Sequence, residues 1–289
     1  MKKLLILSGK GGTGKTTTAS AFIKFSNAKA IADCDVDAPN LHIVSSLKGE
    51  GEVSNFYGSD KSQIDQEKCI ACGKCAESCH FGAIKKESGK YTISEYACEG
   101  CGVCTAVCPV GAAHMVPDIS GELRLFNEDK IFSTAKLKMG RGNSGKLVSA
   151  VKFAMDKAAN PHTDLAIIDG SPGIGCPVIA SISGVDLILA VAEPSLSGLS
   201  DLERILKTAE IFETKTAVCV NKYDISKEKT EEIEKFCQAN SIDFVGKIPY
   251  DKKASKAINE GKCLADFDCP ARDALKEIYD KTVKIIHAL

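Results

Sequence analysis

Eight of the fourteen cysteines lie in two short runs with the same spacing. The first run is Cys69, Cys72, Cys75 and Cys79, and the second is Cys98, Cys101, Cys104 and Cys108. Within each run, two, two and three residues separate successive cysteines. Thiolates are soft ligands that select zinc and iron–sulfur clusters over hard cations. The spacing therefore predicts a metal-binding segment between residues 69 and 108.

The spacing C-x2-C-x2-C-x3-C resembles that of bacterial ferredoxins with two [4Fe–4S] clusters, in which the fourth cysteine of each run ligates the other cluster. The resemblance implies that one cluster is held by Cys69, Cys72, Cys75 and Cys108. It implies that the second is held by Cys98, Cys101, Cys104 and Cys79. Structural zinc is the alternative, but zinc modules favour two separated pairs of Cys or His over three closely spaced thiols.

A second chemical motif lies at residues 9–16, which fit the P-loop pattern G-x-x-x-x-G-K-[ST]. A short apolar strand precedes the motif and a helix-like run, 16–25, follows it. Glycines in such a loop let backbone N–H groups converge on phosphate oxygens. We expect Lys15 to neutralise the β- and γ-phosphates and the Thr16 hydroxyl to bind Mg²⁺. The residues expected to contact nucleotide here are Gly9, Lys10, Gly11, Gly12, Thr13, Gly14, Lys15, Thr16 and Thr17.

Composition narrows the class of protein. With 289 residues, of which 44% are hydrophobic, the chain can bury a substantial core in one or two domains. A net charge of −1 provides no basic field for nucleic acid and no polybasic membrane patch. No apolar run is long enough to span a bilayer, and the apolar part of residues 1–7 is too short for a signal peptide. We expect a cytoplasmic protein without a membrane anchor, and paired clusters suggest an anaerobic or low-oxygen cell.

Short apolar runs that end in polar loops alternate with helix-period stretches over most of the chain. The expected strands are 28–32, 165–168, 187–192 and 216–220. The expected helices are 144–158, 201–212, 229–239 and 271–288. This alternation predicts an α/β fold, with a parallel sheet covered by helices on both faces. Ligands of such folds bind beyond the carboxyl ends of the strands.

The alternation stops in the cysteine segment. We expect residues 59–117 to form a small α+β ferredoxin-like domain, inserted into a discontinuous P-loop domain of residues 1–58 and 118–289. Within the insert, residues 64–68 and 91–93 are expected to be short strands. No low-complexity linker joins the two domains, which predicts that the clusters are held at a fixed position relative to the nucleotide.

Together these motifs resemble the deviant P-loop ATPases of the MinD/ParA/Mrp and nitrogenase iron-protein class, and above all the MinD-type ATPases with an inserted ferredoxin domain. The marks of the resemblance are Lys10 in the P-loop, Asp33-Cys34-Asp35 with Asn40-Leu41, Asp169 to Gly173, and Asn221-Lys222. It implies an Mg²⁺-dependent ATPase that works as a face-to-face homodimer. Lys10 would then act on the partner subunit's phosphates as an arginine finger does.

The resemblance also implies roles at the strand ends. Asp35 is expected to orient or activate the attacking water and to bind Mg²⁺ through water. Asp169 is expected to hold Mg²⁺ through water, and Gly173 to offer its amide to the γ-phosphate. With Lys10 and Lys15, Asp35 completes the expected catalytic set.

Other strand-end residues have weaker assignments. Asn221 is expected to read adenine, with Asp224 as a second candidate. Asp37 is a candidate on the Mg²⁺ side of the site. For Asp33 and Asp37, ordinary capping of a strand end is the alternative.

Several residues outside the motifs have two readings. Cys176 is expected to be a buried thiol, with ligation of an inter-subunit or transferred cluster as the alternative. His80 replaces the proline usual after the fourth cysteine, and it is either a hydrogen-bond donor to a cluster or an exposed spectator.

The C-terminal helix lacks the cationic excess of a membrane-binding helix and is expected to pack on the core. The remaining cysteines, expected to be structural, are Cys34, Cys219, Cys237, Cys263 and Cys269.

Two functions follow from the combination. The first is electron transfer through two [4Fe–4S] clusters, coupled to the binding and hydrolysis of ATP and directed to a redox or iron–sulfur partner protein. The second is an ATP-dependent carrier or scaffold for iron–sulfur clusters or metallocofactors. Complete four-thiolate sites favour stable, electron-carrying clusters over transferable ones.

Overall fold

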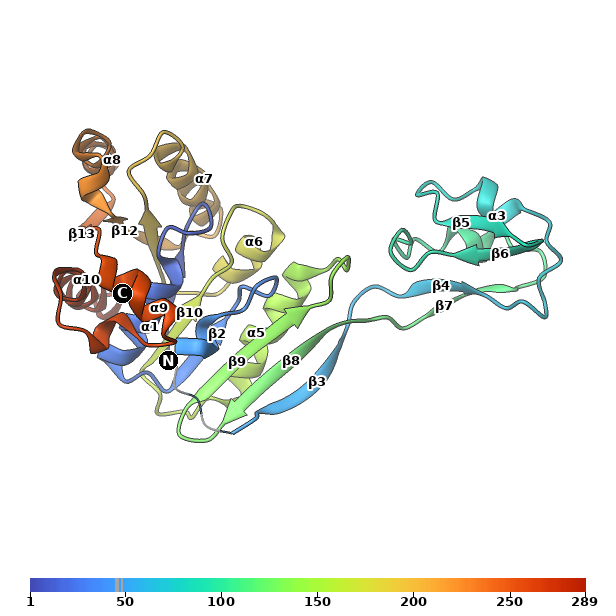
Figure 1. Cartoon of the computed structure of the whole chain (residues 1–289), viewed down its shortest axis with the longest axis horizontal. Coiled ribbons are helices and arrows are strands. Elements are labelled where there is room, and N and C mark those ends of the chain that lie inside the picture. The colour runs from blue at the N-terminus through green and yellow to red at the C-terminus, as the bar shows by residue number, and fades with distance from the viewer. Residues whose placement is uncertain (45–46, 48) are drawn as a thin grey trace. The chain divides into compact units, whose positions relative to one another are not determined.

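The computed structural model describes residues 1–44, 47 and 49–289, and the chain divides into two compact units (Figure 1). Unit 1 consists of Met1–Val53, Leu123–Lys136 and Ser144–Leu289. Unit 2 consists of Ser54–Glu122 and Leu137–Asn143. The P-loop therefore lies in unit 1, and both cysteine runs lie in unit 2.

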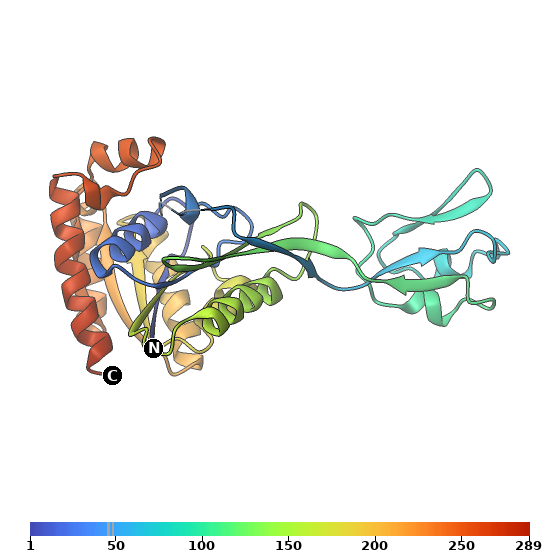
Figure 2. The same cartoon turned by 90° about the horizontal axis from the view of Figure 1, so that it is seen from below.

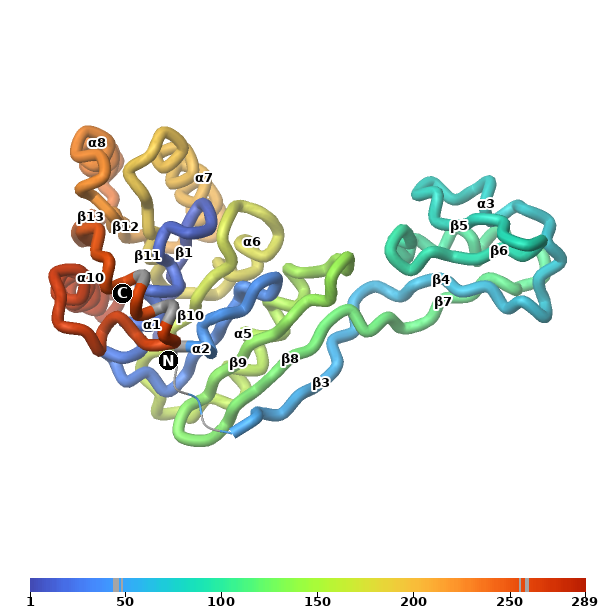
Figure 3. Tube along the Cα trace, viewed as in Figure 1, coloured from blue at the N-terminus to red at the C-terminus, as the bar shows by residue number. Residues whose placement is uncertain are grey.

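A sheet of nine strands, in the described part of the chain, has the order β13-β12-β11-β1-β10-β2-β9-β8-β3. Its strands are β1 (Lys2–Leu7), β2 (Ala30–Asp33), β3 (Glu52–Tyr57), β8 (Ile119–Asn127), β9 (Ile131–Leu137), β10 (Leu165–Asp169), β11 (Leu187–Ala192), β12 (Lys215–Asn221) and β13 (Asp243–Ile248). The seven strands from β13 to β9 in this order are all paired in parallel. Figure 3 shows β1 beside β10 and β11 at the centre of this set. The prediction of an α/β fold is confirmed, and the sheet is mostly parallel.

The sheet is not parallel throughout, which corrects the prediction. Residues 128–130 alone connect β8 to β9, and the two strands are neighbours in the sheet. So short a connection can only join antiparallel strands, because a parallel pair needs a crossover of a dozen or more residues. The segment following the cysteine runs therefore adds an antiparallel edge that the strand–helix pattern did not reveal.

Helices cover both faces of the sheet in unit 1 (Figure 2). They are α1 (Lys15–Ser26), α2 (Leu41–Val44), α5 (Ser144–Ala158), α6 (Cys176–Ile182), α7 (Gly198–Ile211), η1 (Tyr223–Ile225), α8 (Lys227–Ala239), α9 (Lys252–Asn259), η2 (Leu264–Asp266) and α10 (Pro270–His287). Leu4 and Ile6 of β1 belong to one core cluster with Phe22 of α1 and Leu275 of α10. Side chains alternate along a strand, so the equally buried Leu5 faces the opposite helical layer.

The C-terminal helix α10 packs on the core, as predicted. Leu275, Ile278 and Ile286 are buried, and the ring of Tyr279 meets that of Phe22 edge-on at a centroid distance of 5.2 Å. The charged residues between them face outward, so the helical period of the sequence matches the buried stripe. Within the described residues, no helix has both the length and the apolar character needed to cross a membrane.

Unit 2 is built from two similar halves. In the first, β4 (Lys61–Ile64) is followed by α3 (Lys74–Glu77) and β5 (Ile84–Glu87). In the second, β6 (Lys90–Ile93) is followed by α4 (Val103–Ala106) and β7 (Ala113–Val116). The first strand of the first half, β4, pairs antiparallel with the last strand of the second half, β7, and the two inner strands form the pair β5–β6.

The strand expected at residues 64–68 is wrong, because β4 ends at Ile64. The side chain of Asp65 accepts a hydrogen bond from the backbone N–H of Glu67 at 3.0 Å. An aspartate that bonds the backbone two residues ahead favours a turn over a strand. The strand expected at 91–93 is present as part of β6.

Candidate nucleotide and metal-cluster sites

The P-loop lies between β1 and α1, at the carboxyl edge of the parallel strands. Gly12 and Gly14 have φ angles of 79° and 94°, in the left-handed region where a Cβ is costly. A Cβ on Gly14 would also collide with the side-chain amide of Asn221. Gly12 is therefore required for its conformation, and Gly14 for both conformation and space.

Lys15, Thr16 and Asp169 form one hydrogen-bonded cluster. Lys15 Nζ lies 2.6 Å from Asp169 Oδ1, and Thr16 Oγ1 donates to Asp169 Oδ2 at 2.8 Å. The side chains of Lys15 and Asp169 are 6% and 0% exposed. Burial lowers the pKa of Lys15, but the charge and hydrogen bond of Asp169 outweigh it and hold that pKa above its usual value. The lysine expected to bind phosphate and the two residues expected around Mg²⁺ therefore adjoin one another.

Asp33 is the last residue of β2, which lies beside β10 in the sheet, and Asp35 follows it. Asp33 is buried, and its carboxylate accepts hydrogen bonds from the backbone N–H groups of Asp35 and Leu41, both at 3.1 Å. Burial and the charge of Asp169 raise the pKa of Asp33 to about 7. The capping alternative therefore describes Asp33, whereas Asp37 is exposed.

Asp35 is half-buried, and it faces the charges of Lys15 and Asp169. Burial raises its pKa, and the attraction of Lys15 offsets only part of that rise. A carboxylate with a raised pKa is a better proton acceptor than an ordinary aspartate. The role of Asp35 in orienting or activating water stays a prediction.

Lys10 is held within its own chain by residues that the sequence analysis did not assign. Its Nζ lies 3.2 Å from Glu193 Oε2 and 2.9 Å from Ser195 Oγ. Glu193 Oε1 also lies 3.1 Å from the Nζ of Lys222, which donates to the carbonyl of Gly12 at 3.2 Å. The signal in the sequence was the position of Glu193 directly after β11, at the sheet edge where ligands bind.

Asn221 braces the P-loop from the end of β12. Its Nδ2 donates to the carbonyl of Thr13 at 2.7 Å, and its Oδ1 accepts from the N–H of Lys222 at 2.9 Å. Asp224, the second candidate for reading adenine, accepts from the N–H of Tyr250 at 2.7 Å and so fixes the loop after β13. The amide of Gly173 donates to the carbonyl of Ser8 at 3.1 Å, which ties the loop after β10 to the P-loop.

We expect Asn221→Ala to weaken binding of ADP by about tenfold, because Thr13 and Lys222 each lose a hydrogen-bond partner at the P-loop. Isothermal titration of the purified variant measures the change. Asn240→Ala is the matched control, since Asn240 Nδ2 donates to the carbonyl of Phe236 at the exposed end of α8. Unchanged affinity in Asn221→Ala would show that the brace does not shape the loop.

In unit 2, the cysteines gather around two small cavities. The first cavity is lined by Cys69, Cys72 and Cys75 of the first run and by Cys108 of the second. The second cavity is lined by Cys98, Cys101 and Cys104 of the second run and by Cys79 of the first. Each cavity thus combines three thiols of one run with the last thiol of the other run.

Backbone amides point at the sulfur that crosses between the halves. Ala112 N–H donates to Cys108 Sγ at 3.2 Å, and Ala83 N–H donates to Cys79 Sγ at 3.4 Å. Amides around Cys108, that of Ala113 first, hold the pKa of its thiol below the usual value, because they stabilise the thiolate. Burial raises the pKa of Cys75, where fewer donors compensate.

The thiols of each cavity surround a space and do not converge on a point. Within the described residues, no three side chains of His, Cys, Asp or Glu come close enough together to share one metal ion. The four thiolates of a four-iron cluster bind four different irons, so they need not converge. A tetrahedral zinc site would instead need its four ligands around one ion.

The other cysteines are mostly part of the core, as expected. Burial raises the pKa of Cys34 and of Cys219 to about 12, which makes both thiols inert near neutral pH. Cys176 is an exception, because it begins α6 and is exposed, which corrects the expectation of a buried thiol. His80 is exposed as well, and its ring packs edge-on against Phe81 at 5.6 Å.

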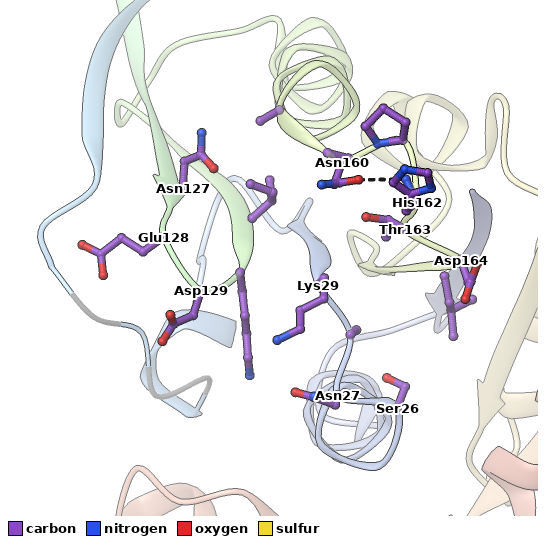
Figure 4. A pocket seen from close by; sticks show the side chains of 17 residues that line it. Ser26, Asn27, Lys29, Asn127, Glu128, Asp129, Asn160, His162, Thr163 and Asp164 are labelled. Atoms are coloured by element: carbon purple, nitrogen blue, oxygen red, sulfur yellow. Dashed lines mark hydrogen bonds between the residues drawn. The ribbon is translucent and has the colours of Figure 1, made fainter.

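Unit 1 also has a larger groove, with a volume of about 740 Å³, at the end of the strands opposite the P-loop (Figure 4). It is lined by residues after α1, between β8 and β9, and between α5 and β10. Asn160 accepts a hydrogen bond there from the N–H of His162 at 2.9 Å. The groove lies at the amino ends of β2 and β10, so it is remote from Asp169 at the carboxyl end of β10 and from Lys15, which contacts Asp169.

Comparison with known proteins agrees with this architecture. The sequence model of the CobQ/CobB/MinD/ParA nucleotide-binding domain matches residues 4–264. An uncharacterised protein of Methanocaldococcus jannaschii is 33% identical over 292 aligned positions, covering 98% of this chain and 97% of that protein. An iron–sulfur cluster carrier protein of Pyrococcus horikoshii is 25% identical over 301 positions, covering 97% of this chain and 85% of its own length.

The solved structure of the cell-division ATPase MinD of Pyrococcus furiosus is similar with a TM-score of 0.59. The match covers 98% of this chain and 99% of MinD at 16% identity, which shows a shared fold. The family match spans most of the chain, and the P-loop lies where that fold requires it. This chain therefore belongs to the CobQ/CobB/MinD/ParA family of nucleotide-binding domains.

Proposed function

We propose that the protein is an ATP-dependent carrier of iron–sulfur clusters, which holds two [4Fe–4S] clusters in unit 2 and binds Mg·ATP in unit 1. The observation that carries the proposal is the pair of four-cysteine cavities in a chain of a nucleotide-binding family. The predicted division into a P-loop domain of residues 1–58 and 118–289 and a cluster domain of residues 59–117 is part of this proposal.

The residues of unit 2 fit such a cluster chemically. Each cavity offers four thiols, the number that a [4Fe–4S] cluster takes, and the amides of Ala83 and Ala112 stabilise two of the sulfurs. The hydrophobic core cluster of the unit is small and centres on Ile84, Cys104 and Ala113. Units with little core usually depend on metals or disulfides, and all of these cysteines are free. When bound, a cluster supplies Fe–S bonds that exchange between thiolates, or a site for one electron.

The residues of unit 1 supply the nucleotide chemistry. Lys15 would exchange its contact with Asp169 for the β- and γ-phosphates, which leaves Asp169 and Thr16 beside each other to hold Mg²⁺. Asp35 would orient the attacking water. The Gly173 N–H would exchange its bond to the Ser8 carbonyl for one to the γ-phosphate. Lys10 would reach a partner subunit's nucleotide in a homodimer, which requires it to leave Glu193.

The carrier is favoured over electron transfer, the function that the cysteine pattern first suggested. Relatives over nearly the whole chain include iron–sulfur cluster carrier proteins of Pyrococcus and a cytosolic Fe–S cluster assembly factor of Drosophila melanogaster. Electron transfer stays the second candidate, because two complete four-thiol sets suit clusters that remain in place.

Transfer of clusters to an acceptor tests the proposal. Anaerobically loaded protein is mixed with an apo-ferredoxin, and the acceptor's absorbance is followed with ATP or with ADP. We expect ATP to accelerate transfer by about fivefold or more, since coupling between two sites usually has this size. Equal rates with both nucleotides would refute the carrier function. A shift of cluster potential with ATP but without transfer would instead favour electron transfer.

A further inference from the structure

The two cysteine cavities of unit 2 differ in their exposure. In the second cavity, Cys98 and Cys104 are 8% and 9% exposed. Their counterparts in the first cavity, Cys69 and Cys75, are only half-buried. The other positions match, since Cys72 and Cys101 are both exposed and Cys108 and Cys79 are both half-buried. Solvent and an incoming ligand therefore reach the first cavity at two more of its cysteines, Cys69 and Cys75.

A second difference lies at equivalent positions of the internal repeat. Ser62 precedes Cys69 by seven residues, as Tyr91 precedes Cys98. Because the halves interlock, Ser62 lines the second cavity and Tyr91 lines the first. The hydroxyl of Tyr91 lies beside Gly73, where an added Cβ would come within 2.9 Å of it. The repeat thus places a small hydroxyl in one cavity and an aromatic ring in the other.

The Ser62 hydroxyl contacts a cysteine sulfur directly. Ser62 Oγ lies 3.0 Å from Cys104 Sγ and 3.3 Å from the carbonyl of His114, and the serine is 4% exposed. A protonated Cys104 donates to Ser62, which donates its own proton to His114. A thiolate bound to iron has no proton, so the hydroxyl must then donate to the sulfur. Such a bond stabilises the thiolate and hence the ligand.

We propose that the two sites have different tasks: the site of Cys69, Cys72, Cys75 and Cys108 gives up its cluster as cargo, and the site of Cys98, Cys101, Cys104 and Cys79 retains its cluster. Ser62 is the positioning residue that anchors the retained cluster through Cys104. The inference deepens the proposed carrier function and rests on it.

Release from the first site is an exchange of ligands. Each Fe–S bond to a cysteine of the first cavity breaks as a thiolate of the acceptor forms a bond to the same iron. Each acceptor thiol loses a proton, each released cysteine gains one, and the irons keep their oxidation states. This exchange requires that an incoming thiolate can reach the iron and that water can supply a proton to the released cysteine. Both are easier where the cysteines are more exposed.

Removal of iron by a chelator separates the two sites. The loaded, full-length protein is treated anaerobically with bathophenanthroline disulfonate, and the iron complex is followed by absorbance. We expect two phases of equal amplitude. Cys69→Ala removes the fast phase, and Cys98→Ala removes the slow phase.

Variants at the repeat positions test the anchor. Ser62→Ala speeds the slow phase by about tenfold, Ser62→Thr restores it, and the matched control Tyr91→Phe leaves it unchanged. A redox titration followed by electron paramagnetic resonance gives a second readout. Ser62→Ala lowers one of the two midpoint potentials, because the lost hydrogen bond favoured the more negative, reduced cluster.

Three results would overturn the inference: loss of iron in one phase, a fast phase that belongs to the site of Cys98, or a slow phase unaffected by Ser62→Ala. Protein that binds no cluster would refute the proposed function itself. Protein with two clusters that leave at one rate would refute only the division of tasks.

Discussion

Lys15→Ala is expected to abolish ATP hydrolysis and to leave the absorbance of both clusters intact. The lysine is expected to supply the cation for the β- and γ-phosphates, and Lys10 is held by Glu193 and Ser195. Hydrolysis is measured as phosphate release and cluster content as iron per chain. Loss of the clusters together with hydrolysis would show that unit 2 depends on the nucleotide site for its integrity.

The same substitution is expected to lower the free energy of unfolding of unit 1 by about 3–5 kcal/mol, because it leaves the buried Asp169 without its cation. The double variant Lys15→Ala/Asp169→Asn removes the unpaired charge. It should recover most of the stability in urea unfolding and none of the hydrolysis.

A matched control exists in the lysine at the start of β1. Lys3 Nζ lies 2.7 Å from Asp156 Oδ2, but both side chains are partly exposed. Lys3→Ala should therefore cost less than about 1 kcal/mol of stability and leave hydrolysis unchanged. An equal loss in both variants would mean that the burial of the Lys15–Asp169 pair does not matter.

Paired cysteine substitutions are expected to show which thiols share a cluster. Cys69→Ala/Cys108→Ala damages only the first cavity, so about four irons should remain per chain. Cys69→Ala/Cys79→Ala damages both cavities and should leave almost no iron. Iron and sulfide analysis of anaerobically purified protein measures the difference.

The opposite outcome would be equally clear. If each run of four cysteines held its own cluster, Cys69→Ala/Cys79→Ala would keep one cluster and Cys69→Ala/Cys108→Ala would lose both. The two variants remove the same number of thiols from the same unit. Their difference therefore reports which thiols share a site, with general destabilisation held nearly constant.

Much of the fold could be predicted because its signals are local. The helix expected at residues 144–158 is present as α5, and the apolar runs at 187–192 and 216–220 lie in β11 and β12. In each case the spacing of apolar residues matches the period of the element that buries them. The glycines of the P-loop are local in the same sense, because their backbone angles need no distant partner.

Predictions failed where a local pattern had more than one outcome. Residues 64–68 were expected to be a strand, but Asp65 bonds to the backbone ahead of it and makes a turn. Cys176 has the residue type of a core position and yet is exposed at the start of α6. The hairpin of β8 and β9 was missed because the pairing of strands depends on the neighbours available in the sheet.

The sequence alone determined the P-loop, the two cysteine runs and the alternation of strands and helices, because spacing along the chain sets them. Only the tertiary structure decided that Glu193 holds Lys10, that Asn221 braces Thr13 and that Ser62 faces Cys104. The two residues of each contact are far apart in the chain. Ser62 and Cys104 are separated by 42 positions, Asn221 and Thr13 by 208, and Glu193 and Lys10 by an intermediate number. Such contacts arise from the order of strands in a sheet and the pairing of β4 with β7, which no short stretch of sequence encodes.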